Sequence, residues 1–75
     1  MTTLEYDPEL ASKGNWSGTK LGDRRSAIVT CPACGQEISL SHFYIFYDGK
    51  VTPSLVCPHD GCDFHDWITL ENWSQ

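Results

Sequence analysis

At 75 residues the chain has room for one domain. A domain of this size buries a smaller fraction of its surface on folding than a larger one does, so its apolar core alone contributes little stability. The formal net charge of −5 disfavours the phosphate backbone of a nucleic acid and favours a protein partner with a basic surface. The first residues lack the basic and apolar segments of a secretion signal, and no stretch approaches the ~20 apolar residues of a membrane span. We therefore expect a cytoplasmic protein that makes no membrane contact.

A short helix is predicted near the start of the chain. Asp7 suits the N-cap, Pro8 the first helical position, and Gly14 the position just past the helix end. These residues predict a helix of about two turns over Pro8–Lys13.

Residues 14–25 are rich in glycine and polar groups and predict a loop, with Trp16 as the side chain that can anchor it on the core. The predicted organisation is an N-terminal extension of short helix and loop over residues 1–25, followed by the main domain over residues 26–75.

The main domain shows the pattern of β-structure. Asp48 and Gly49 are the strongest hairpin signal, because this pair suits the positive φ angles of a tight turn. Pro53 has no backbone N–H, so the strand that carries it is expected at a sheet edge or at a bulge. The predicted strands cover residues 26–30, 37–41, 50–56 and 64–70.

Four cysteines lie in two close pairs on either side of the predicted hairpin. Two thiolates a few residues apart can hold one side of a tetrahedral zinc ion, and a second pair completes the ligand set. A proline follows the first cysteine of each pair and a glycine adjoins the second, as tight metal-binding loops require. The sequence therefore predicts a zinc ribbon, a small β-rich domain stabilised by Zn²⁺ on Cys31, Cys34, Cys57 and Cys62. Because a complete ligand set leaves no position for a substrate, we expect no enzymatic activity.

Two histidines leave the fourth metal ligand open. His65 follows Cys62 with the spacing Cys-x-x-His, and His59 lies within the second cysteine pair, so either imidazole could replace Cys57. We favour four thiolates, with His59 in solvent and His65 on a strand. Two disulfides are the other alternative, and a reducing compartment disfavours them.

Several further motifs accompany the cysteines. They are Cys31 with Cys34, Asp48-Gly49-Lys50-Val51, Pro53-Ser54, Cys62, and His65-Asp66-Trp67-Ile68. Through these residues the stretch 31–68 resembles a zinc-ribbon family of unknown function from bacteria and their phages. The resemblance implies no enzymatic activity, and it implies that His65 is a ligand or supports one. Cys57 departs from the family pattern.

An aromatic run precedes the predicted hairpin turn. Side chains alternate along a strand, so one face would hold Phe43, Ile45 and Tyr47 and the other Tyr44 and Phe46. A thin ribbon buries only one face. The other face is either covered by residues 1–25, through Trp16 and Leu10, or forms an interface with a partner or a second copy of the chain.

The negative charge lies in the cysteine-bearing half, because residues 1–30 carry four basic and four acidic side chains whereas residues 31–75 carry one and six. The leading functional hypothesis is an adaptor or inhibitor that binds a basic protein through an acidic, aromatic-bearing surface. One alternative is a zinc ribbon associated with nucleic acid or the transcription machinery, with Lys20, Arg24 and Arg25 as phosphate contacts. The other is a rubredoxin-like or thiol-redox protein, which the four-residue gap within the second cysteine pair disfavours.

Overall fold

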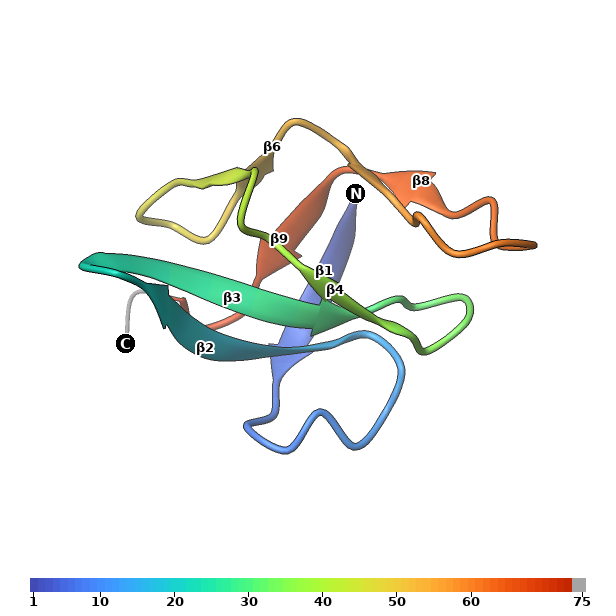
Figure 1. Cartoon of the computed structure of the whole chain (residues 1–75), viewed down its shortest axis with the longest axis horizontal. Helices are drawn as coiled ribbons and strands as arrows, with labels where there is room; N and C mark the ends of the chain where they lie inside the picture. The colour runs from blue at the N-terminus through green and yellow to red at the C-terminus, as the bar shows by residue number, and fades with distance from the viewer. Residues whose placement is uncertain (74–75) are drawn as a thin grey trace.

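Short β-strands account for the regular secondary structure of the described part of the chain, which is residues 1–73 without the side chain of Leu21. In this computed structural model, with the labels of Figure 1, the strands are β1 (Thr2–Tyr6), β2 (Asn15–Leu21), β3 (Arg24–Thr30), β4 (Glu37–Ser39), β5 (Tyr44–Ile45), β6 (Val51–Thr52), β7 (Leu55–Val56), β8 (His65–Asp66) and β9 (Ile68–Leu70). Within these described residues there is no helix long and apolar enough to cross a membrane.

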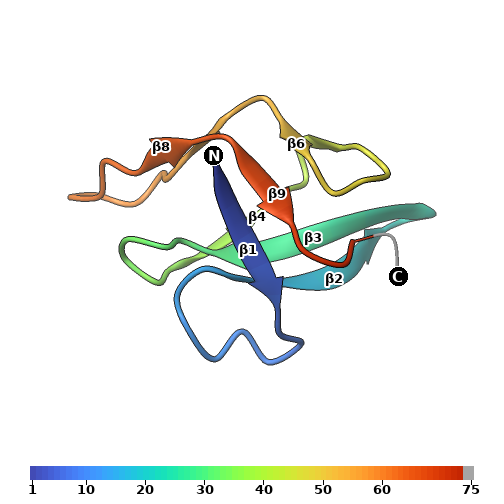
Figure 2. The ribbon, with the colours of Figure 1, turned by 180° about the vertical axis from the view of Figure 1, so that it is seen from behind.

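Five strands form one sheet in the order β4-β3-β2-β1-β9. Strands β2 and β3 make an antiparallel hairpin, and β4 pairs antiparallel with β3 at one edge. Strand β1 runs parallel to both of its neighbours: Thr2–Leu4 pair with β9, whereas Glu5 and Tyr6 pair with β2. Figures 1 and 2 show β1 and β9 side by side, on one side of the β2–β3 hairpin. The first strand therefore joins the two ends of the chain in one sheet.

The prediction of a helix over Pro8–Lys13 is wrong. Turns and bends occupy this segment, and Leu10 has a φ of 52°, which ends any right-handed helix. The Asp7 carboxylate does cap backbone N–H groups, those of Glu9 (3.0 Å) and Ala11 (3.2 Å), but it caps a turn. A six-residue helix has no stability of its own, and the strands on either side are already paired in the sheet.

The loop predicted over residues 14–25 is also wrong, because most of this segment belongs to β2 and to the start of β3. Trp16 is buried, and its indole N–H donates to the Glu71 carbonyl (2.8 Å) while its ring lies against Tyr6 and Trp73. The polar residues of β2 are tolerated because one face of an antiparallel pair can face water. The predicted boundary after residue 25 lies within β3.

The remaining predicted ranges do contain strands, but two of them are divided: 50–56 into β6 and β7, and 64–70 into β8 and β9. Strands β3, β4, β8 and β9 lie within or overlap the predicted ranges, and the Asp48-Gly49 turn joins β5 to β6. Pro53, which follows a cis peptide bond, separates β6 from β7. Prolines interrupt strands because they cannot donate to the hydrogen-bond ladder.

The aromatic run before the turn is only partly buried. Phe43 and Ile45 pack against the core, but Tyr47 is 87% exposed in the turn. On the other face Tyr44 and Phe46 are exposed and stack edge to face, with ring centroids 4.9 Å apart. Since Trp16 packs against other rings, it does not cover this pair.

The core lies between the β2–β3 hairpin and the strands that follow it. Its buried apolar side chains are Leu4, Trp16, Ala27, Val29, Cys31, Ile38, Leu40, Val51, Leu55, Cys57, Ile68, Leu70 and Trp73. Two of the four cysteines are therefore part of the core itself.

The chain start is held against the β8–β9 segment. The hydroxyl of Thr2 donates to Asp66 Oδ2 (2.7 Å) and holds the pKa of this carboxyl below its ordinary value. The N–H of Trp67 donates to the other carboxylate oxygen (2.8 Å) and acts in the same direction. Asp66 thus fastens the start of β1 to β8, just before the last strand.

Gly49 provides the first test of the fold. Its φ is 95° and its carbonyl accepts a hydrogen bond from Leu70 N–H (2.8 Å), so that the β5–β6 hairpin is tied to β9. A Cβ here would collide with the Leu70 carbonyl oxygen. We expect Gly49→Ala to lower the free energy of unfolding by about 3 kcal/mol, measured by urea denaturation.

The matched control is Gly22→Ala. Gly22 also has a positive φ (64°), but no atom lies within 4 Å of the position that an added methyl group would take. Gly22→Ala should lower the free energy of unfolding by about 1 kcal/mol, because only the backbone conformation disfavours the new side chain. Equal losses in the two variants would show that Gly49 is not closely packed against β9.

Candidate metal centre

The first cysteine pair lies in a tight loop between β3 and β4. The N–H of Cys31 donates to the Gln36 carbonyl (2.9 Å), and the N–H of Gly35 donates back to the Cys31 carbonyl (2.8 Å). Gly35 has a φ of 80°, which glycine adopts without steric cost. The loop therefore closes on itself and directs Cys31 and Cys34 to the same side.

The second pair lies in a loop of the same kind between β7 and β8. The N–H of Cys57 donates to the Phe64 carbonyl (3.0 Å) across the mouth of the loop, and the N–H of Cys62 donates to the His59 carbonyl (3.1 Å). Gly61 provides the positive φ, 81°. The two loops lie at the same end of the molecule, opposite the β5–β6 hairpin (Figures 1 and 2).

The four sulfur atoms meet between these loops. All four Sγ atoms lie within 4.8 Å of one another, and two contacts join the two loops: 3.6 Å from Cys31 to Cys62 and 3.6 Å from Cys34 to Cys57. The cysteines are free thiols, so the disulfide alternative does not describe this arrangement. Four sulfurs around a tetrahedral zinc ion at about 2.3 Å would be separated by about 3.8 Å. The cluster is thus of the right size to coordinate one metal ion.

The electrostatics of the cluster favour a bound cation. Burial opposes ionisation of Cys31, but hydrogen bonds from the backbone N–H groups of Cys34 and Ala33 lower its pKa to about 7. Burial raises the pKa of Cys57 to about 12, and the neighbouring thiols add to this effect. Four thiolates so close together repel one another, and a divalent cation offsets this repulsion.

Neither histidine takes a place in the sulfur cluster. His59 Nδ1 lies 3.4 Å from Cys57 Sγ, where it contacts a sulfur and does not replace it. His65 Nε2 forms a hydrogen bond with the Ser54 hydroxyl (2.7 Å) on the exposed face of the β7–β8 ladder. All four predicted cysteines, and no histidine, therefore make up the cluster among the described residues.

Two contacts near the cysteine loops are not predicted by the sequence analysis, although Ser54 belongs to one of its motifs. Ser54 orients His65, and Lys13 donates from its Nζ to the Ala33 carbonyl (3.3 Å) and so places a positive charge beside the first loop. The sequence pattern places Lys13 at the end of a helix, and only the actual path of residues 7–14 brings it here.

Compared with known proteins, the chain matches no family model, no curated protein and no solved structure. The resemblance to a zinc-ribbon family therefore remains a prediction from its motifs, and the geometry of the cysteines carries the functional argument.

The roles of the fourth cysteine and of His65 can be separated by substitution. Cys57→Ser should reduce the bound metal far below one ion per chain, because it removes a sulfur from the cluster. His65→Ala should keep one ion per chain, because its imidazole contacts Ser54 instead. Elemental analysis of the two purified variants by mass spectrometry measures the number of metal ions per chain. Metal loss in His65→Ala together with retention in Cys57→Ser would assign the fourth ligand to His65.

Proposed function

We propose that the chain is a zinc ribbon whose four cysteines hold one structural Zn²⁺. The observation that carries this proposal is the approach of four sulfurs, two from each loop, to within 4.8 Å of one another. An all-thiolate set suits soft metals such as zinc, copper(I) and iron. Zinc is favoured over a rubredoxin-like iron site because the second pair has four intervening residues, unlike the first.

A structural role fits the place of the site in the fold. Four thiolates fill a tetrahedral shell and leave no position for a substrate, which supports a non-catalytic protein. Cys31 and Cys57 are buried in the core, so the ion would fasten the end of β3 to the end of β7. In a domain of this size such a link replaces stability that the small core cannot supply.

Zinc and fold are therefore expected to be coupled. Native mass spectrometry should show one zinc ion per chain, and a chelator should remove both the ion and the β-sheet circular dichroism signal. Structural zinc contributes on the order of 10 kcal/mol, which is comparable to the whole stability of a small domain. Gln36→Ala is the control, since Gln36 contacts the site only through its backbone carbonyl. A chelated protein that stays folded would contradict the proposal.

The function then lies in what the surface binds. Around the second loop, an exposed surface that we term the knuckle face consists of Val56, His65 and Trp67 with Asp60 and Asp63. Val56 is paired with His65, and Trp67 lies two residues further on, so all three share one side of the β7–β8 ladder. Val56 is 56% exposed and Trp67 is 53% exposed. Exposed apolar side chains therefore share one side of the ladder, and the loop that joins its two strands carries the exposed Asp60 and Asp63.

We infer that the knuckle face binds a basic protein, so that the chain acts as an adaptor or inhibitor. A zinc ion with four thiolates carries a net charge of −2 and adds to that of Asp60 and Asp63. Negative potential speeds association with a basic surface, while a desolvated aromatic side chain supplies most of the affinity. Trp67 is the exposed aromatic side chain of this face.

The experiment is affinity capture from an extract of the native host, with three forms of the zinc-loaded chain. A basic protein should be captured by the parent chain and by Tyr44→Ala, whose ring is exposed at the opposite end. Trp67→Ala should reduce this capture at least tenfold, as is typical of an aromatic side chain at the centre of an interface. Capture should also fall as salt is added. A partner that Trp67→Ala retains and Tyr44→Ala loses would contradict the assignment to the knuckle face.

A further inference from the structure

Basic side chains gather at the end of the molecule opposite the cysteine loops. The turn of the β2–β3 hairpin and the β5–β6 hairpin both lie there (Figures 1 and 2). Lys20 and Arg25 face each other across β2 and β3, and Arg24 is next in the chain. The ion pair between Lys50 and Asp48 (3.9 Å) lies in the other hairpin. Asp23 lies in the turn of the β2–β3 hairpin, so the two hairpins carry four basic side chains (Lys20, Arg24, Arg25 and Lys50) against two acidic ones (Asp23 and Asp48). This basic end thus has an excess of positive charge, although the net charge of the chain is negative.

Arg25 occupies a special place at this basic end. Its guanidinium lies 4.0 Å above the Trp73 ring centroid and donates to the Trp73 carbonyl, which fixes its position. The same side chain lines two separate hollows in the surface. Its positive charge therefore acts on both hollows.

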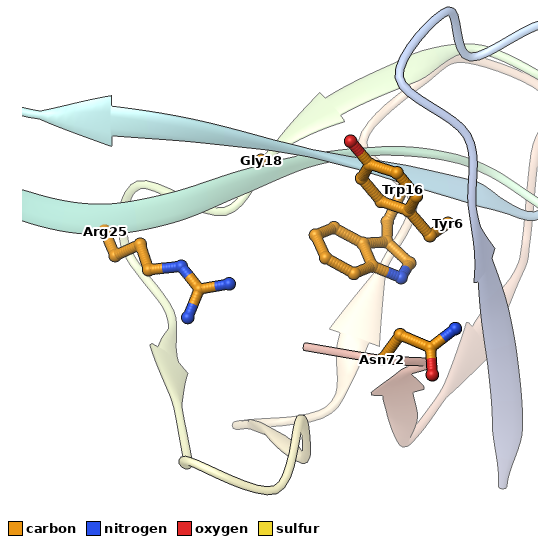
Figure 3. Close-up of a pocket in the computed structure, with 5 residues that line it drawn as sticks. All are labelled: Tyr6, Trp16, Gly18, Arg25 and Asn72. Carbon is orange, nitrogen blue, oxygen red and sulfur yellow. The ribbon is translucent and has the colours of Figure 1, made fainter. Parts of the chain in front are cut away.

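The larger hollow has aromatic walls. Figure 3 shows Tyr6 and Trp16 together on one side of an open space, with Arg25 across from them and Asn72 at its edge. Its volume is about 540 Å³, within the range of sites that bind small organic groups. Gly18 of β2 also lines it, and the missing side chain leaves room there.

The smaller hollow, of about 100 Å³, is on the other side of Arg25. Arg24 and Tyr44 line it together with Phe43 and Ile45. Tyr44 is 60% exposed, and its ring is held by edge-to-face contact with Phe46. Arg24 is held by a hydrogen bond to the Ser41 carbonyl (2.8 Å). Both walls of this hollow are therefore fixed before any ligand binds.

We propose that this basic, aromatic end binds single-stranded nucleic acid. Bases would stack on the exposed rings of Tyr6 and Tyr44, and the phosphates between them would lie at Arg25, with Arg24 and Lys20 at the margin. An aromatic hollow on each side of one fixed cation matches the alternation of base and phosphate along a strand. An acidic peptide has no regular aromatic group beside each charge, and a duplex hides its base faces. The proposal uses none of the knuckle-face residues, so it stands apart from the proposed protein contact.

The charge contacts can be tested with fluorescein-labelled dT15 and the zinc-loaded full chain, by fluorescence anisotropy at increasing salt. Three phosphate contacts predict a slope of about −2 in log K against log salt. Arg24→Gln and Lys20→Gln should each lower the affinity and make this slope shallower. Lys13→Gln also removes one positive charge, but beside the cysteine loops, so it should change neither the affinity for dT15 nor the salt slope. Arg25→Gln would also remove the contact with the Trp73 ring, so its effect on binding could not be separated from an effect on the fold. The variants of Arg24 and Lys20 are therefore used.

The stacking contacts form the second half of the test. Tyr6→Ala and Tyr44→Ala should each weaken dT15 binding about tenfold, as expected for loss of one stacked base. Trp67→Ala should leave it unchanged, whereas that variant loses the proposed protein partner. A 15-base-pair duplex should bind more weakly than dT15. Equal affinity across the parent and the Arg24, Lys20 and Tyr44 variants would overturn the proposal. Equally tight binding of labelled poly-glutamate would instead assign the surface to an acidic protein segment.

Discussion

The approach of four cysteine sulfurs to within 4.8 Å of one another is the constraint on which the rest of the structure depends. It brings together two loops that follow different strands, β3 and β7. Because Cys31 and Cys57 are also buried in the core, the site and the core are one unit. Thiolates at these distances repel one another strongly, and a bound divalent ion would turn this repulsion into the strongest link of the fold.

This arrangement also separates the two ends of the molecule. The cysteine loops occupy one end of the molecule, and the turn of the β2–β3 hairpin and the β5–β6 hairpin lie at the other (Figures 1 and 2), where Arg24 and Arg25 line a hollow with the exposed Tyr44. The two proposed contacts, the knuckle face and the basic end, therefore replace the single acidic, aromatic-bearing surface expected from the sequence. Together the two proposed contacts describe an adaptor that would link a basic protein to a nucleic acid.

How much could be predicted from the sequence depends on how local each signal is. The cysteine pairs and the Asp48-Gly49 turn are short-range patterns with a direct geometric meaning, and the structure places them as predicted. The prediction for the N-terminal segment fails for the opposite reason. Asp7 is a genuine capping residue, but the segment that follows it connects two sheet strands: β1 pairs with β9, far away in the chain, and β2 pairs with β3 in a hairpin. No local pattern indicates that Thr2 will meet Asp66, or that Arg25 will lie on Trp73.

X-ray absorption at the zinc edge identifies the atoms bound to the ion in the unsubstituted protein. A zinc ion held by the four cysteines should have four sulfur neighbours at about 2.3 Å and no lighter ligand, because the two loops bring four sulfurs together. A nitrogen neighbour at about 2.0 Å would place an imidazole in the site and contradict the four-cysteine assignment. Protein that contains no zinc and in which the four cysteines form two disulfides would contradict the proposed zinc site altogether.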